Sequence, residues 1–117
     1  MVIFNKTKKT MVAKDYRLCR SAGSKARGLM FTNESRVKDR ALLFEFRKPM
    51  LQSLHMFFVF YPIDVVFLDG KKRVVELKQN FRPFQVYNSR KQAKYVIELP
   101  ESTIKKSRTA VGDVVKW

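Results

Sequence analysis

The most constraining feature of the chain is a run of 15 mostly apolar residues, 54–68, that contains one His, one Pro and one Asp. A membrane-spanning helix needs about 20 apolar residues, and a central Asp would cost it roughly 3 kcal/mol. The run therefore predicts core strands. Residues 56–60 are wholly apolar and predict a central strand covered on both faces, so Phe58→Ala is expected to cost about 3–5 kcal/mol. Pro62 cannot donate to a sheet, and residues 63–68 predict the next strand.

Other segments alternate between apolar and polar side chains, as strands of a packed sheet do. Residues 41–46 and 94–99 show this pattern most clearly. Residues 2–20 predict a strand or hairpin, and Asp69-Gly70 predicts a hairpin turn before residues 73–77.

The rest of the chain predicts shorter elements. Short helices are expected over residues 22–30 and after Pro100, and residues 114–117 predict a final strand. Residues 32–40 and 79–93 are expected to be irregular. The expected fold is mainly β (α+β): a single antiparallel β-barrel or sandwich-like domain over residues 1–117, with two short helices.

Composition excludes several classes of protein. A chain of 117 residues accommodates one domain, and its hydrophobic content of 45% is too high for a disordered basic tail. One Cys cannot build an intrachain disulfide framework, and one Cys with one His cannot supply the four ligands of a structural zinc site. We therefore predict no metal and no cofactor.

The formal net charge of +15 favours binding to polyanions such as RNA or DNA. The region from residue 80 to residue 95 interleaves aromatic and basic side chains, a combination that can hold single-stranded nucleic acid. Arg82, Arg90 and Lys91 are the candidate nucleic-acid contacts. The alternative is that the aromatic side chains there pack a loop over the domain and the basic ones form a solvated face.

Five blocks of sequence, taken together in their order, carry a family resemblance. They are residues 27–31 (RGLMF), 55–69 (HMFFVFYPIDVVFLD), 75–77 (VEL), 93–100 (AKYVIELP) and 112–113 (GD). The chain resembles the prokaryotic family catalogued as domain of unknown function 192. The resemblance implies a small β-rich domain and supplies no established activity. Many bacterial relatives carry an export or lipoprotein signal, whereas this sequence has no apolar stretch at its start, which favours the cytoplasm.

Three residues are candidates for a ligand pocket: Arg27, His55 and Asp64. Asp64 lies among apolar neighbours, so its carboxylate must be hydrogen-bonded, paired or protonated. It can cap loop amides or pair with Arg27, or it can belong to a pocket. His55 is the only His of the chain. It can contribute a hydrogen bond at a pocket rim or have a purely structural role.

The sequence contains no established catalytic motif, because a nucleophile elbow, a phosphate-binding loop, a dinucleotide fingerprint and a zinc-protease motif are all absent. We therefore expect a noncatalytic, β-rich binding module in the cytoplasm with an unidentified ligand and no membrane span. The alternative is a nucleic-acid-associated protein that uses its basic surface.

Overall fold

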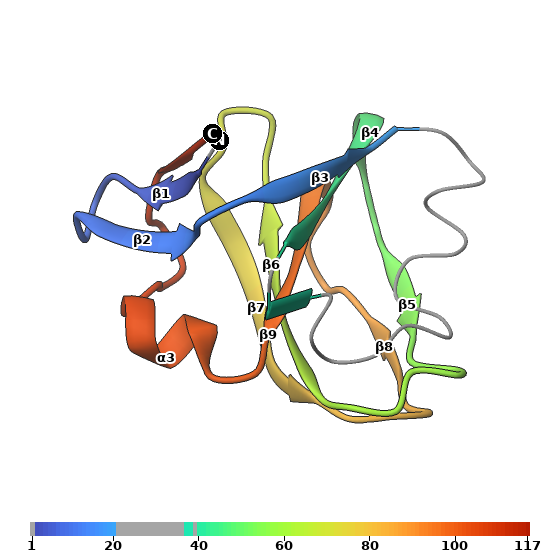
Figure 1. The fold of residues 1–117 in the computed structure, drawn as a ribbon. Coiled ribbons are helices and arrows are strands. Elements are labelled where there is room, and N and C mark those ends of the chain that lie inside the picture. Colours follow the sequence, from blue (N-terminus) through green and yellow to red (C-terminus); the bar gives the residue numbers. More distant parts are fainter. Residues whose placement is uncertain (1, 21–36, 39) are drawn as a thin grey trace.

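The computed structural model describes residues 2–20, 37–38 and 40–117, and a five-stranded sheet is its centre (Figure 1). Across this sheet the strands lie in the order β3 (Tyr16–Cys19), β4 (Ala41–Met50), β9 (Ala93–Pro100), β6 (Ile63–Leu68) and β7 (Val74–Phe81). All neighbours are antiparallel except β3 and β4, which are parallel.

Two smaller sheets and a helix complete the described part. One small sheet has the order β10 (Val115–Lys116), β1 (Ile3–Asn5) and β2 (Thr10–Ala13), and the other pairs β5 (Ser53–His55) with β8 (Val86–Asn88). Helix α3 (Thr103–Ser107) follows β9. The prediction of a mainly β, α+β domain is confirmed. Its barrel alternative is not, because the strands form separate sheets that do not close into a barrel.

The alternating patterns bury side chains on both faces of the central sheet. In β4, Leu42 and Phe44 belong to one hydrophobic core, whereas Ala41 and Leu43 belong to the core on the opposite face. All six residues of β6 are buried, so this strand is covered on both faces.

The hairpin predicted at Asp69-Gly70 joins β6 to β7. The Asp69 carboxylate accepts hydrogen bonds from the backbone N–H groups of Lys71 at 2.9 Å and Arg73 at 3.0 Å. An Asp side chain that bonds its own turn is the reason this residue favours the position.

The predicted strand over residues 56–60 is wrong, because these residues form a loop between β5 and β6. Met56 and Val59 are buried, but Phe57, Phe58 and Phe60 are 44%, 45% and 64% exposed. The physical reason is that β6 already pairs with β9 on one edge and β7 on the other, so no place in this sheet remains beside it.

One other sequence prediction needs adjustment. Residues 79–93 are not wholly irregular, because β7 continues to Phe81 and β8 forms within them. The helix expected after Pro100 is present as α3, which begins at Thr103. The helix expected over residues 22–30 lies outside the described residues.

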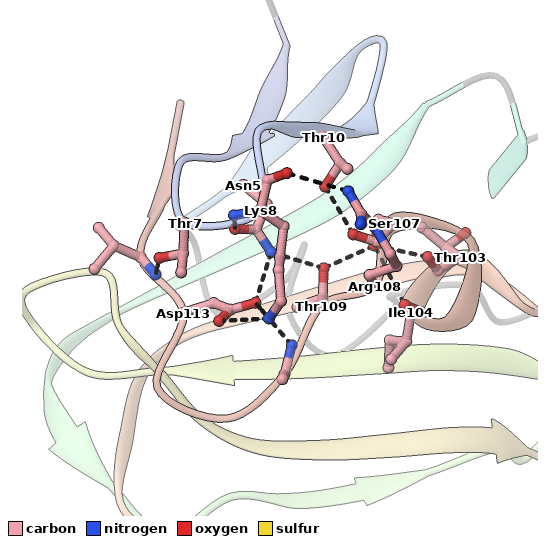
Figure 2. Close-up of polar contacts among 12 residues, drawn as sticks. Asn5, Thr7, Lys8, Thr10, Thr103, Ile104, Ser107, Arg108, Thr109 and Asp113 are labelled. Carbon is pink, nitrogen blue, oxygen red and sulfur yellow. Dashed lines mark hydrogen bonds and ion pairs between the residues drawn. The ribbon is translucent and has the colours of Figure 1, made fainter.

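A buried polar network joins the β1–β2 hairpin to the C-terminal segment (Figure 2). The Asn5 side-chain amide donates to the Thr109 hydroxyl at 3.1 Å and to Asp113 Oδ2 at 2.9 Å. The Lys8 ammonium group lies 2.9 Å from the same carboxylate oxygen. Burial opposes ionisation of Asp113, but the hydrogen bonds from Asn5, Lys8 and the Ala110 amide outweigh it and lower the pKa of this carboxyl.

Candidate functional site

The buried carboxylate of Asp64 accepts hydrogen bonds from two backbone amides. Its Oδ1 accepts from the Asn80 N–H at 3.1 Å, and its Oδ2 accepts from the Ile104 N–H at 2.9 Å. Both amides need such an acceptor. The pairing of β6 with β7 shifts register after Ile63, and the N-cap Ser102 of α3 supplies no side-chain hydrogen bond.

Arg27, the proposed ion-pair partner of Asp64, lies outside the described residues, so this pairing stays a prediction. His55 is exposed at the end of β5. Its Nδ1 accepts from the Phe57 N–H at 3.2 Å, and its ring stacks on the Phe57 ring with centroids 5.0 Å apart. His55 and Asp64 therefore form their hydrogen bonds with different neighbours. The nearby Ser53 hydroxyl lies 2.7 Å from Asn88 Oδ1, to which it donates.

The three candidate nucleic-acid contacts lie at opposite ends of β8. Arg82 is exposed in the turn that precedes this strand, and Arg90 and Lys91 follow it. The backbone N–H groups of Arg90 and Lys91 donate to Glu76 Oε1 at 2.8 and 2.9 Å.

A carboxylate therefore lies directly beneath the Arg90–Lys91 turn. Glu76 also accepts a hydrogen bond from the Tyr87 hydroxyl, and this bond is the main cause of the raised pKa of Tyr87. Val111 and these residues border an open hollow of about 340 Å³. The negative charge of Glu76 disfavours a phosphate at this place.

The loop between β5 and β6 meets the turn before β8, and together they expose a cluster of aromatic and aliphatic side chains. We call this cluster the phenylalanine surface; its members are His55, Phe57, Phe58, Phe60, Phe84 and Val86. Phe84 and Val86 are 51% and 55% exposed. The rings of Phe58 and Phe60 both meet the Phe84 ring near edge-on, with centroids 6.3 and 5.6 Å away.

Two members of the phenylalanine surface have a backbone conformation that bulky side chains rarely adopt. Phe58 has φ of 59° and Phe84 has φ of 62°. Residues in the left-handed region carry a cost of about 1–3 kcal/mol, and such outliers cluster at functional sites. Here the strain holds two large apolar side chains at the surface.

Backbone hydrogen bonds join the two loops of this surface. The Met56 N–H donates to the Gln85 carbonyl at 2.8 Å, and the Phe84 N–H donates to the Met56 carbonyl at 2.8 Å. The Val59 N–H donates to the same carbonyl at 3.2 Å. Because Met56 is buried, it anchors both loops to the core while the phenylalanine rings face outward.

Sequence reasoning assigned Phe57, Phe58 and Phe60 to the core, because an apolar run has the same composition in a buried strand as in an exposed loop. Pro62, two residues after Phe60, indicates only where a strand must end and does not distinguish a preceding strand from a loop.

Sequence reasoning also missed Glu98, a buried carboxyl on β9. It lies between Leu42 of β4 and Val65 of β6 in the register of the central sheet. Among the residues that the structure describes, no donor reaches its Oε1. Burial raises the pKa of Glu98 to about 7. This carboxyl can therefore exchange a proton near neutral pH.

A family model described as "Uncharacterized ACR" (DUF192) matches residues 3–117 of the chain. A UPF0127 protein of Pyrococcus abyssi is 35% identical over 116 residues, which covers 99% of this chain and 97% of the relative. A UPF0127 protein of Thermococcus sibiricus is 34% identical over 118 residues, which covers 99% and 74%.

Two solved structures share the fold. A protein of unknown function from Novosphingobium aromaticivorans has a TM-score of 0.81 at 19% identity, covering 99% of this chain and 82% of that one. A protein of Sinorhizobium meliloti named as a candidate transcription regulator has a TM-score of 0.79 at 23% identity, covering 86% and 79%. At such identities the likeness concerns the fold alone. Across the described residues, no helix has the length and apolar character needed to cross a membrane.

Proposed function

Because the chain belongs to the uncharacterised DUF192 family, we propose a function from its own residues: it is a single-domain, noncatalytic binding module whose binding site is the phenylalanine surface. One observation carries the proposal. Phe58 and Phe84 are both about half exposed and both have left-handed backbone. The fold maintains this strained arrangement although it leaves large apolar side chains in water.

Two physical arguments support a binding role. Contiguous exposed apolar side chains on a small domain mark interaction sites more often than isolated ones do. The hydrogen bonds between the Met56 and Phe84 segments fix the loops before any partner arrives, so little conformational entropy is lost on binding.

The candidate pocket residues take different parts in this proposal. His55 belongs to the surface through its stacking on Phe57. Asp64 supports the sheet and α3 from within and does not contact the partner. Arg27 stays a candidate partner of Asp64. We place the protein in the cytoplasm, as expected from the sequence.

Nucleic-acid binding is the second candidate function. The net charge of +15 and the position of Arg82 two residues from Phe84 favour it. The placement of Glu76 beneath the Arg90–Lys91 turn counts against a continuous phosphate track through these three residues.

The test is chemical-shift mapping of the ¹⁵N-labelled protein with three anionic probes used separately. The probes are lipid bicelles containing phosphatidylserine, an oligothymidylate and a polyglutamate peptide. The proposal expects at least one probe to shift amides of residues 55–60 and 82–88, and Phe60→Ser to weaken that binding. Absence of shifts in both segments with all three probes would overturn it. The matched control is Val2→Ser, because Val2 is 42% exposed and lies outside the surface.

A further inference from the structure

We infer that the partner of the phenylalanine surface is an anionic lipid surface, on which the protein docks with its two loops in the headgroup region. The inference rests on the proposed function, because it names the partner of the same site. Three observations carry it: the local charge, the kind of apolar side chain and the paired backbone of the loops.

The segments that build and flank the phenylalanine surface are basic, although Glu76 of β7 lies beneath the Arg90–Lys91 turn and offsets the charge there. Residues 46–63 and 79–97 contain six Lys or Arg and no Asp or Glu. The six are Arg47, Lys48, Arg82, Arg90, Lys91 and Lys94. A basic segment near an anionic leaflet gains about fivefold in affinity for each Lys or Arg that reaches the headgroups. Arg82 is the nearest of them in sequence to the exposed ring of Phe84.

The apolar side chains suit hydrocarbon better than stacked bases. The Phe58 and Phe60 rings both contact the Phe84 ring edge-on. The three rings therefore form one cluster and not a row of separate faces on which bases could stack. Base stacking needs a π-face for each base. An exposed aliphatic side chain adds to the apolar area but offers no such face, and Val86 at 55% exposure is of this kind.

Several backbone N–H groups of the two loops are already hydrogen-bonded within the protein, which suits an environment with little water. An N–H or C=O that enters the interface without a partner is costly. The amides of Met56, Val59, Phe84 and Gln85 all donate to backbone carbonyls within or between the two loops. The loops lie at the lower right of the molecule as drawn in Figure 1, at one end of the central sheet.

The experiment is co-sedimentation of the full chain with vesicles of phosphatidylcholine alone or of phosphatidylcholine mixed with phosphatidylserine. We expect binding to the mixed vesicles and little to phosphatidylcholine. Phe60→Ser and Phe84→Asn should each lower the affinity at least about tenfold, because each removes an exposed ring that would become buried in the lipid interface on docking. Asn tolerates the left-handed backbone of residue 84, so the second variant keeps the fold.

Matched controls separate the surface from general charge. Arg82→Gln should lower vesicle affinity about fivefold. Lys105→Gln removes an exposed charge on α3, and Val2→Ser removes an exposed apolar side chain beside β1. Both should leave affinity within about twofold. Equal losses for Lys105→Gln and Arg82→Gln, with none for the Phe variants, would overturn the inference.

The same variants distinguish failure of the inference from failure of the proposed function. If the vesicles do not bind but the oligothymidylate or the polyglutamate binds and depends on Phe60, the lipid inference is wrong and the binding site stands. If the vesicles bind and the Phe variants do not matter, both the lipid docking and its site are wrong. Thermal unfolding of each variant confirms that the fold is intact.

Discussion

The Asp64 carboxylate lies 2.9 Å from the backbone nitrogen of Ile104, 40 residues further along the chain. This hydrogen bond attaches the first turn of α3 to the central sheet. The other carboxylate oxygen receives the amide of Asn80, a residue with a left-handed φ of 50°. One buried side chain therefore supports both an irregular strand pairing and a helix end that has no cap of its own.

Asp64→Asn should lower the free energy of unfolding by about 2–3 kcal/mol, because the amide group of Asn would face one N–H donor with another donor. Urea unfolding measures the loss. Asp69→Asn is the control, since Asp69 also accepts two amides but does so at the solvent-exposed turn, and it should cost about 1 kcal/mol or less. Unchanged stability of Asp64→Asn with altered ligand binding would instead support a pocket role.

Glu98 should make stability fall as the pH rises from about 4.5 to about 7. The folded pKa of about 7 exceeds the ordinary value of 4.5, so the folded state binds more protons in this window. Above pH 7, ionisation of the buried Glu98 carboxyl lowers the free energy of unfolding by about 3 kcal/mol. Glu98→Gln has no carboxyl to ionise, so its stability relative to the wild type should increase as the pH rises.

The measurement for Glu98 is the difference in unfolding free energy between wild type and Glu98→Gln in urea at several pH values. The difference cancels the titration of all other groups. A difference that stays constant between about pH 5 and about pH 8 would contradict a carboxyl whose ionisation destabilises the fold.

Phe58→Ala should cost about 1 kcal/mol, well below the 3–5 kcal/mol that a fully buried Phe loses. The reason is that Phe58 is 45% exposed. Phe67→Ala is the matched comparison, because Phe67 is 0% exposed in β6 and should lose the full amount. Equal losses for the two variants would restore the original prediction of a central strand over residues 56–60.

Asn5→Ala should destabilise the protein by about 2 kcal/mol, because it removes a donor from the buried Asp113 carboxylate. The lowered pKa of Asp113 adds a pH signature. Its stabilising contribution is present above the ordinary pKa of 3.8 and is lost as the pH falls through the folded value. Acid unfolding should therefore depend less on pH in Asp113→Asn than in the wild type, and an unchanged acid transition would contradict the role of this network.

Local periodicity predicted the central sheet well, because successive side chains of a strand lie on opposite faces and the sequence alternates accordingly. Leu42 and Phe44 separate from Leu43 in the structure as they do in the alternating pattern. The hairpin at Asp69 was equally accessible, since its side chain bonds to its own turn and needs no distant partner.

The candidate site could not be predicted in the same way, because its exposure depends on pairings between distant segments. Residues 56–60 cannot pair with β6, because both edges of β6 are occupied by β7 and β9. Glu98 follows the alternation of β9 like any polar residue, and only the packing of Leu42 and Val65 beside it makes it a buried carboxyl. The hydrogen bonds that Asp64 accepts from the Asn80 and Ile104 amides likewise cannot be predicted from local sequence.

The pairing of β1 with β10 places Phe4 opposite Lys116, so the two ends of the described chain lie side by side, away from the loops that carry Phe60 and Phe84 (Figure 1). Proteins whose ends are neighbours tolerate fusion and circular permutation. A fluorescent reporter or an immobilisation tag can therefore be attached at either end without covering those loops. A tethered molecule would present them outward, which suits a sensor-chip measurement of the surface described above.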